Sequence, residues 1–474
     1  MDSKKTNADN LFISFKFPPD KDISGMVVGK RIIKNNLKVD VLHNSLGNED
    51  DLSFKEINNF INERLSTSVN SERDSVECIF NFINQGLKLI GDRQYNKIYS
   101  RSWYMSNHYL ALEYKFRHPD VFWTAEFSDP VLMNMKGVKK TDSLSVLDNK
   151  EYIDGINSKI DEYNKNHHTD IDKLSNPGNT FYLAEFLTFL FADEIIFTNA
   201  NQRSIMLGSY DEYIKKLVMD KSRIIPHPTL DSEYYHLANN ELNLNKDEIN
   251  MAYFGNSYYI SRHFEPLFFA FESLNHKYKN KIKFHLFINK DEFLNFLTDD
   301  LEFKNNIIIR EPLEYFEFLN ATLKFDILLI NDTVTNEYFN INPYLPSKLS
   351  DYLGSNKDIW AIYEDNSTLS KIDCKYKSSI SDYRQSRDVL LKILEDYGYA
   401  DSEYSFDDSF YEKRINQLNK IIGSQYSLTN RHKLKVDSLN KSNKKLKREN
   451  KEILSSNSWK LTEPLRKLFS FFRK

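Results

Sequence analysis

The residues best suited to chemistry stand in the run from Pro346 to Gly354, which holds a hydroxyl, a cation and a carboxylate in Ser347, Lys348 and Asp351. Apolar stretches flank this run on both sides, and the order predicts a buried strand, a loop, a helix and a second strand. In an open α/β sheet, ligands bind beyond the carboxyl ends of the strands, and the unpaired N–H groups at a helix start attract phosphate. The run therefore predicts a site for a nucleotide-linked substrate, with an ordinary helix start as the alternative.

Two series of predicted strands and helices must position this run. In the first half, strands are predicted at 10–17, 39–42, 97–102, 121–126 and 194–199, with helices at 24–35, 110–116 and 181–191. In the second half, strands are predicted at 249–254, 282–288, 306–309, 325–330 and 358–363. The alternation predicts an α/β protein with two doubly wound domains, at 1–230 and 245–405. Pro226 and Pro228 stiffen the chain at the predicted boundary.

The run from Pro346 to Gly354 also resembles the donor-binding helix of bacterial GT-B glycosyltransferases of family 4. The resemblance covers roughly residues 10 to 400 and implies two Rossmann-like domains that face a cleft. In that family an acidic residue, here Asp351, holds the ribose hydroxyls of a nucleotide sugar, although the usual residue is glutamate. The family's frequent second glutamate, eight positions earlier, is missing because Pro343 stands there. The sequence therefore predicts neither the positioning of the sugar nor the stereochemistry of transfer.

Two further residues of the second half fit a phosphate site. The predicted strand at 249–254 is followed by Gly255, and Arg262 comes a short loop later. Family members often carry a strand, a glycine and then a basic residue that meets the donor diphosphate, and arginine can give two N–H groups to phosphate oxygens. With Lys348, Arg262 would stabilise the departing nucleotide without a metal. A surface arginine beside two tyrosines is the alternative.

The first half supplies the other candidates. Gly25 follows Ser24, which could cap the helix, and lets the backbone approach the donor closely, unless it marks a simple helix start. The resemblance implies that a histidine or polar loop and an aspartate-proline element line the acceptor side, here His108 and Asp129. Asp129 is the candidate general base, with a plain strand end as the alternative. His108 is the second catalytic candidate, and a structural role in a partly buried loop is its alternative.

Composition indicates a folded protein, because 40% of the 474 residues are hydrophobic and 14% are aromatic. The two cysteines, Cys78 and Cys374, lie far apart in sequence, which favours a reducing compartment. The first residues are polar, unlike a signal peptide, and the longest apolar stretch, 181–192, is too short to span a bilayer. We therefore expect a cytoplasmic protein.

The polar stretch at 139–179 is expected to form an excursion or a helical insertion. It contains His167, His168, Asp170 and Asp172, which suggest a metal site at first sight. Adjacent histidines cannot both face one side of a helix, and these carboxylates do not follow a buried strand as a metal-binding Asp-x-Asp does. We expect no metal and no cofactor, with a nucleotide sugar as the substrate.

Charge is distributed unevenly along the chain. Residues 431–474 hold fourteen Lys or Arg against four Asp or Glu, so this segment carries +10 and the remainder carries −14. The acidic body argues against nucleic-acid binding, and the basic tail needs its own explanation.

The tail shows three patterns. A helix at 406–428 is expected to return to the first domain. Beyond it, 429–474 forms a tail in which a heptad spacing at 432–453 predicts a short coiled coil and a homo-oligomer contact, with a plain stalk helix as the alternative. The stretch 458–474 mixes bulky apolar residues with five cations, which suits the surface of an anionic membrane, and docking on the protein's own body is the alternative. The run after Ser458 resembles the tails of bacterial capsule and cell-wall polysaccharide transferases.

Together these features predict a glycosyltransferase that moves a sugar from a nucleotide sugar to a polysaccharide or lipid-linked acceptor in bacterial envelope glycan synthesis. It would work at the inner face of the cell membrane as a peripheral protein. A catalytically silent GT-B scaffold at the membrane is one alternative, favoured by the missing glutamate. Transfer of a polyol phosphate from a CDP-linked donor is another. The sugar, the base, the acceptor and the oligomeric state are not predicted.

Overall fold

The computed structural model describes residues 8–36, 38–44, 52–141, 143–255, 264–289 and 302–399, which all belong to one compact unit that extends to Ser405. Arg262 lies outside the described residues. So do the predicted return helix at 406–428, the coiled coil at 432–453 and the basic segment at 458–474. None of the described helices has the length and the apolar content that crossing a bilayer requires.

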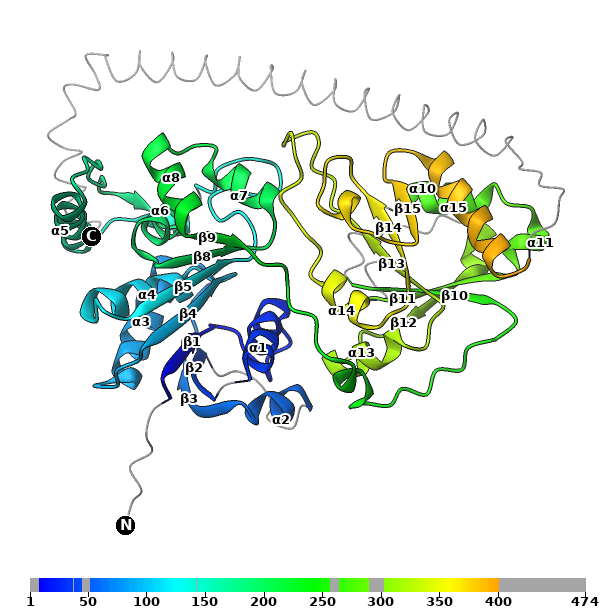
Figure 1. The fold of residues 1–474 in the computed structure, drawn as a ribbon, viewed down its shortest axis with the longest axis horizontal. Coiled ribbons are helices and arrows are strands. Elements are labelled where there is room, and N and C mark those ends of the chain that lie inside the picture. Colours follow the sequence, from blue (N-terminus) through cyan, green and yellow to red (C-terminus); the bar gives the residue numbers. More distant parts are fainter. Residues whose placement is uncertain are drawn as a thin grey trace, which may run out of the picture. The chain divides into compact units, whose positions relative to one another are not determined.

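Seven parallel strands form the first sheet, in the order β3-β2-β1-β4-β5-β8-β9 (Figure 1). They are β1 (Asn10–Ile13), β2 (Val39–Asn44), β3 (Ile61–Thr67), β4 (Lys97–Ser102), β5 (Phe122–Phe127), β8 (Glu194–Phe197) and β9 (Ser222–Ile224). The helices of this half are α1 (Ile23–Asn35), α2 (Leu52–Asn58), α3 (Val76–Ile90), α4 (Ser106–Arg117), α5 (Lys150–His167), α6 (Thr180–Phe191), α7 (Ala200–Leu207) and α8 (Glu212–Lys221). A small antiparallel ladder joins β6 (Val146–Leu147) and β7 (Gly178–Asn179), and short 3-10 turns occur at η1 (Ser143–Ser145) and η2 (Ser232–His236).

Six parallel strands form the second sheet, in the order β12-β11-β10-β13-β14-β15. They are β10 (Ile249–Phe254), β11 (Ile282–Phe287), β12 (Ile307–Arg310), β13 (Ile327–Asn331), β14 (Asp358–Tyr363) and β15 (Tyr376–Ser379). The helices are α10 (Glu265–Glu272), α11 (His276–Lys279), α13 (Tyr315–Thr322), α14 (Lys348–Gly354) and α15 (Tyr383–Asp396), with η3 (Glu302–Asn306) and η4 (Leu369–Lys371). In both sheets the chain winds outward from the first strand and then crosses back, so each sheet has a switch point beside that strand. The predicted α/β class with two doubly wound sheets is confirmed.

The two faces of the first sheet have separate apolar cores, because successive side chains of a strand point to opposite faces. Leu11 and Ile13 of β1 pack in a core with α3, α4 and α6, whereas Phe12 packs in a second core with α1. This second core also contains Phe316 and Leu319 of α13, so it continues into the second half. Burial and hydrophobic packing therefore connect α1 to both halves of the described unit.

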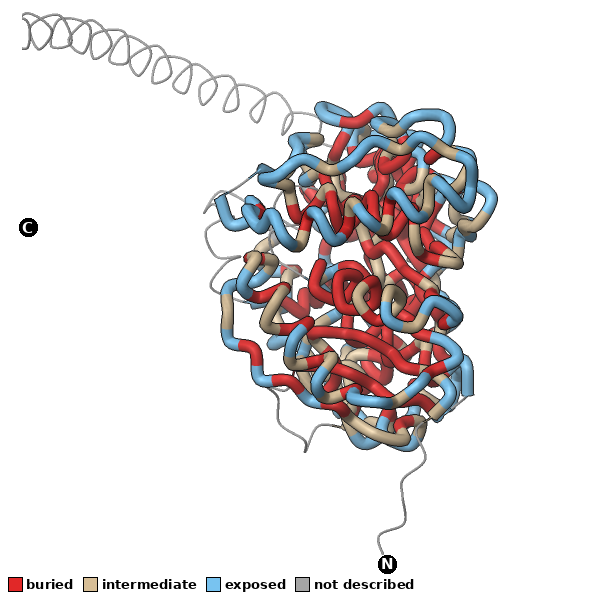
Figure 2. Tube along the Cα trace, turned by 90° about the vertical axis from the view of Figure 1, so that its left-hand side faces the viewer, coloured by how far each residue is buried: buried red, intermediate tan, exposed pale blue. Residues whose placement is uncertain are grey.

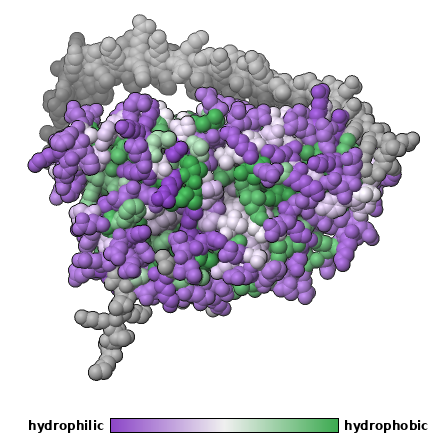
Figure 3. Space-filling view, viewed as in Figure 1, coloured by the Kyte–Doolittle hydropathy of each residue, from purple (hydrophilic) through white to green (hydrophobic). Residues whose placement is uncertain are grey.

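Buried and exposed residues are distributed as expected for sheets covered by helices. Figure 2 shows the buried residues along the strands and the inner sides of the helices, with exposed residues on the outer turns. On the face shown in Figure 3, hydrophilic residues fill most of the margin and hydrophobic residues gather toward the middle.

Several predicted boundaries were wrong. Helix α1 is capped by Asp22, whose carboxylate accepts a hydrogen bond from the N–H of Gly25 at 2.7 Å, and not by Ser24. Helix α4 starts at Ser106, four residues before the predicted start. The sequence gives no signal for this start, because Met105 occupies the cap position without a capping side chain. The helical insertion expected within 139–179 is confirmed, since this stretch holds the 18-residue helix α5. The predictions also left out α2, β3 and α3, which lie between β2 and β4.

Candidate functional site

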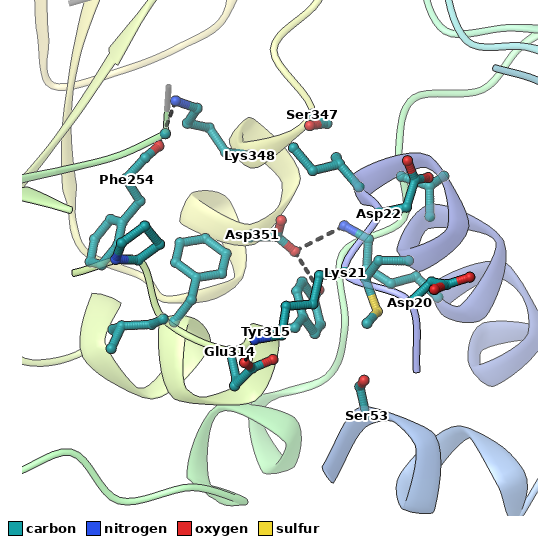
Figure 4. A pocket seen from close by; sticks show the side chains of 18 of the residues that line it. Asp20, Lys21, Asp22, Ser53, Phe254, Glu314, Tyr315, Ser347, Lys348 and Asp351 are labelled. Carbon is teal, nitrogen blue, oxygen red and sulfur yellow. Dashed lines mark hydrogen bonds and ion pairs between the residues drawn. The ribbon is translucent and has the colours of Figure 1, made fainter. Parts of the chain in front are cut away.

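A cavity of about 390 Å³ lies at the carboxyl ends of β10 and β11, next to the switch point of the second sheet. Loops and helices of both halves line it, as Figure 4 shows. The second half contributes Phe254, Gly255, Phe287, Pro312, Leu313, Glu314, Tyr315, Phe318, Ser347, Lys348 and Asp351. The first half contributes Pro19, Asp20, Lys21, Asp22, Ile23, Met26, Val27, Lys30 and Ser53. The predicted donor residues Gly255, Ser347, Lys348 and Asp351 are thus brought to one cavity.

Asp351 is held by a lysine from the other half of the unit. Its Oδ1 atom accepts hydrogen bonds from Lys30 Nζ at 2.9 Å and from the Tyr315 hydroxyl at 2.7 Å. Lys30 also donates to the Ser350 hydroxyl at 2.9 Å. Burial lowers the pKa of Lys30, and the nearby Asp351 carboxylate opposes that shift. Burial and the same carboxylate raise the pKa of Tyr315. The hydroxyl therefore stays protonated and can donate its hydrogen bond to Asp351.

Lys348 occupies the opposite corner of the cavity with neutral partners. Its ammonium donates to the carbonyl of Phe254 at 2.6 Å and lies 3.9 Å from the centre of the Tyr253 ring. In the described part of the chain, no carboxylate forms an ion pair with Lys348, and burial lowers its pKa to about 7. Gly255 makes room for this arrangement, because a Cβ there would meet both the Lys348 ammonium and the Tyr253 hydroxyl. The Gly255 N–H itself donates to Phe287 within the sheet.

The helix that carries Lys348 and Asp351 is fixed at its far end. The Tyr235 hydroxyl, from the segment between the two sheets, donates to the carbonyl of Asp351 at 2.7 Å. Gly354 is the last residue of this helix, and only glycine fits there because a Cβ would collide with Tyr235. The hydroxyl of Tyr352 accepts a hydrogen bond from the N–H of Phe254 at 3.2 Å, which ties α14 to the end of β10.

The loop before α14 is also tied to the first half. The side chain of Asn199 donates to the carbonyl of Pro343 at 3.0 Å, and Asn201 donates to the carbonyl of Asn342 at 2.9 Å. Within the second half, Glu364 accepts hydrogen bonds from the same loop, including one from Asn342 Nδ2 at 2.8 Å. Pro343, at the position where the family frequently has a second glutamate, is therefore buried, and its carbonyl accepts the hydrogen bond from Asn199.

Helix α1 is anchored to the first sheet by a buried ion network. Arg31 donates to Glu126 at 3.0 Å and to the carbonyl of Pro226 at 2.9 Å. Arg101 donates to the other oxygen of Glu126 at 3.0 Å. Burial alone would raise the pKa of Glu126, but Arg31 and Arg101 hold it at about 2. Because Arg31 is fixed in this way, its neighbour Lys30 is presented to the second half.

Two carboxylates of the first half lie in one electrostatic neighbourhood. Asp22 lines the cavity, whereas Asp129 is a half-buried residue after β5 that does not line it. Burial raises the pKa of both carboxyl groups, and Arg73 and Arg101 oppose that rise in each case. Asp22 therefore joins Asp129 as a candidate for the acceptor side.

Neither His108 nor Gly25 lines the cavity. His108 is 1% exposed, and its ring packs edge-on against Phe127 in the core of the first half. Its Nδ1 atom is 2.8 Å from the hydroxyl of Ser100, and burial lowers its pKa to about 3, so the ring stays neutral. The structure does not support a catalytic assignment for His108, since an earlier helix start buries it. Gly25 packs against the carbonyl of Lys16, which leaves no space for a Cβ, so the ligand-approach interpretation has a packing explanation in its place.

The predictions missed Lys30, Tyr315 and Asp22. Lys30 interrupts the apolar stripe of α1, and a lysine on the buried side of a helix is a signal that the sequence does carry. Asp22 stands three residues before Gly25, the spacing of a helix cap. Tyr315 gave no sequence signal, because its role depends on the approach of α13 to α14.

In the described part of the chain, no group of three or more His, Cys, Asp or Glu side chains is placed to hold a metal ion. His167 ends α5 and His168 follows it in the left-handed conformation, so the two rings belong to a helix end.

The fold and the cavity together define a class: two doubly wound domains with a site at the switch point of the second, which is the GT-B fold. Neither a family model nor a curated protein sequence matches the chain. Several solved structures are similar to the chain in fold. HepE from Anabaena, in complex with UDP and glucose, has a TM-score of 0.51 at 9% identity, over 83% of this chain and 91% of that one.

Two further solved structures are similar over comparable lengths. Sucrose-phosphate synthase from Thermosynechococcus elongatus has a TM-score of 0.50 at 11% identity, over 82% of this chain and 90% of that one. The trehalose-6-phosphate synthase of E. coli, bound with UDP-2-fluoro glucose, has a TM-score of 0.50 at 10% identity, over 81% of this chain and 91% of that one. At these identities the similarity shows the fold.

Proposed function

We propose that the protein is a glycosyltransferase that takes a sugar from a nucleoside diphosphate sugar bound in the cavity described above. One observation carries the proposal: a cation with neutral partners, Lys348, and a carboxylate, Asp351, sit on one helix at the switch point of the second sheet. A diphosphate supplies the anion that Lys348 lacks, and a ribose supplies hydroxyls for Asp351. The ligands named with two of the similar structures, UDP and UDP-2-fluoro glucose, agree with this chemistry.

The reaction needs little from the protein beyond placement and charge. An acceptor hydroxyl oxygen bonds to the anomeric carbon, and the bond from that carbon to the diphosphate oxygen breaks. The leaving diphosphate keeps the electron pair, and the Lys348 ammonium stabilises its charge. The acceptor proton passes to a base, for which Asp22 and Asp129 are the candidates, since burial raises the pKa of each.

We further propose the family 4 type of reaction, with a polysaccharide or lipid-linked acceptor of the bacterial envelope. The basic segment at 458–474 would hold the enzyme on the inner face of the membrane, and 432–453 would supply a contact between copies. These proposals rest on sequence patterns that lie outside the described residues.

The test is a panel of UDP, GDP, dTDP and CDP sugars, with release of the nucleoside diphosphate as the readout for transfer or slow hydrolysis. We expect release from one nucleotide class, and a loss of about 10- to 100-fold in Lys348→Ala and Asp351→Ala. Lys34→Met serves as the control, because Lys34 lies on α1 with an exposed ion pair to Asp231. Release that is equal in wild type and both variants would contradict the proposal.

A catalytically silent scaffold is the second candidate, and the Pro343 loop favours it. The position of the family's second glutamate holds a proline whose carbonyl is bonded by Asn199, so no carboxylate from this position reaches the cavity. A scaffold would bind a nucleoside diphosphate but release none from any sugar.

CDP-glycerol in the same panel tests transfer of a polyol phosphate, which would release CMP and not CDP.

A further inference from the structure

The contacts of Lys30 and Asp351 leave one donor and one acceptor open. Lys30 Nζ carries three N–H bonds, and two of them are directed to Asp351 Oδ1 and to the Ser350 hydroxyl, each at 2.9 Å. Among the described residues the third has no acceptor. Asp351 Oδ1 accepts from both Lys30 and Tyr315, whereas its Oδ2 accepts from no described residue. Both side chains line the cavity.

An ammonium N–H beside a carboxylate oxygen matches a pair of neighbouring hydroxyls. One hydroxyl can donate to the carboxylate while the other accepts from the ammonium, because each hydroxyl is both a donor and an acceptor. Such hydrogen bonds are stronger than neutral ones because one partner is charged. A ligand that lacks either hydroxyl leaves a buried charged group without its partner, and a site built in this way rejects that analogue strongly.

We infer that Lys30 is a specificity-determining residue for the ribose of the donor, and that it reads the vicinal diol together with Asp351 from the opposite half of the unit. The inference rests on the proposed function and adds a residue to it. The first half, in this account, contributes to donor recognition and not to acceptor recognition alone. It also makes ribose recognition depend on the contact between the two halves, because Lys30 belongs to α1 and Asp351 to α14.

Helix α1 holds Lys30 in place for this task. Its neighbour Arg31 is bonded to Glu126 and to the carbonyls of Ile225 and Pro226, and the apolar face of α1 packs in a core that includes Phe316 of α13. A ligand group can be recognised to within a few tenths of an ångström only when its partner is fixed by surrounding contacts of this kind.

Calorimetric titration with paired nucleotides tests the inference. The probes are UDP, GDP and CDP, each with its 2′-deoxy counterpart, and dTDP, titrated into the full chain. We expect wild type to prefer the ribonucleotide by about 10-fold or more. In Lys30→Met the affinity for the ribonucleotide should fall by about 10-fold, while the deoxynucleotide changes by less than about twofold, so the preference disappears. Lys34→Met, one turn further along α1, should keep the wild-type preference.

The outcomes are distinguishable. If wild type binds neither the three ribonucleotides nor dTDP, the proposed function fails. If it binds dTDP alone, the inference fails and the proposed function stands. If wild type binds but does not prefer the ribonucleotide, or if Lys30→Met weakens both nucleotides of a pair equally, the inference fails and the proposed function stands. Because Lys30→Met leaves Asp351 uncompensated and can impair folding, Lys30→Met/Asp351→Asn is measured beside it. This neutral pair should also bind both nucleotides alike, and a retained ribose preference in it would overturn the inference.

Discussion

Two lysines line the same cavity from opposite halves, and their surroundings differ. Lys30 is paired with a carboxylate, whereas Lys348 has a carbonyl and an aromatic ring as its partners. Burial lowers the pKa of both. A compensated cation has little to gain from a further anion, so it serves to fix a carboxylate and to bind neutral hydroxyls. An uncompensated cation gains most from an anion that arrives with the ligand.

The largest expected difference is in stability, because substitutions of the two lysines should change the free energy of unfolding in opposite directions. Lys30→Met should lower the free energy of unfolding by about 3 kcal/mol, because it leaves the Asp351 carboxylate buried without a cation. Lys348→Met should raise it by about 1 kcal/mol, because it removes a desolvated charge. Chemical denaturation without nucleotide measures both, with Lys34→Met as a control close to zero. A shift in the same direction for both lysines would contradict the distinction.

Nucleotide affinity tests whether Lys348 binds the diphosphate. Lys348→Met should weaken binding of the preferred nucleoside diphosphate by about 30- to 100-fold but the nucleoside monophosphate by only about threefold, because Lys348 serves the diphosphate. Calorimetric titration of both ligands measures the ratio. The matched control is Lys375→Met, since Lys375 has exposed ion pairs to Asp358 and Asp396. Equal losses for the two ligands would place Lys348 away from the diphosphate.

Gly255→Ala should shift the Lys348 ammonium and also strain the backbone, because Gly255 has a φ of 159° that residues with a side chain rarely adopt. The added methyl group would meet the ends of two side chains, Lys348 and Tyr253, and the flexible lysine can move. We expect about a 10-fold loss of nucleoside diphosphate affinity together with a lower melting temperature, while the folded protein retains its secondary structure. Gly155→Ala is the control, because nothing lies within 4 Å of a Cβ at this exposed position of α5. Unchanged affinity in Gly255→Ala would argue against this corner as the diphosphate site.

The smallest effect concerns pH. The pKa of Lys348 is lowered to about 7 by burial, so the free protein loses this cation as the pH rises above 7. Because the bound anion favours the charged form, affinity should fall by about fivefold between pH 7 and pH 8, and binding at pH 8 should take up about one proton. Titration in buffers with different ionisation enthalpies measures the uptake. Lys348→Met should remove it, and uptake that persists in this variant would assign it to another group.

The sequence was most informative where one short run carries both the fold and the chemistry. The run from Pro346 to Gly354 predicted α14, its flanking strands and three lining residues of the cavity, because strand, loop and helix signals are local. The sequence-based predictions failed where a residue's role depends on tertiary contacts. His108 was placed in a loop because the start of α4 lacks a capping side chain, and Lys30 was missed because its carboxylate lies 321 positions further along the chain.

Two glycines also show which part of a role the sequence indicates and which part the fold decides. Gly255 was predicted to bind the donor, and in the structure its missing side chain makes space for the Lys348 ammonium from another loop. Gly25 was predicted to approach the donor, and its missing side chain is explained by the carbonyl of Lys16. A glycine in the sequence thus indicates a close approach, while the partner in that approach is set by the fold.

The most direct test of the account is a crystal structure of the protein soaked or co-crystallised with UDP, or with whichever nucleoside diphosphate binds best. The account predicts the diphosphate within hydrogen-bond distance of Lys348 Nζ and the ribose hydroxyls on Asp351 Oδ2 and Lys30 Nζ. A nucleotide bound elsewhere, or one in this cavity with its diphosphate turned away from Lys348, would contradict it.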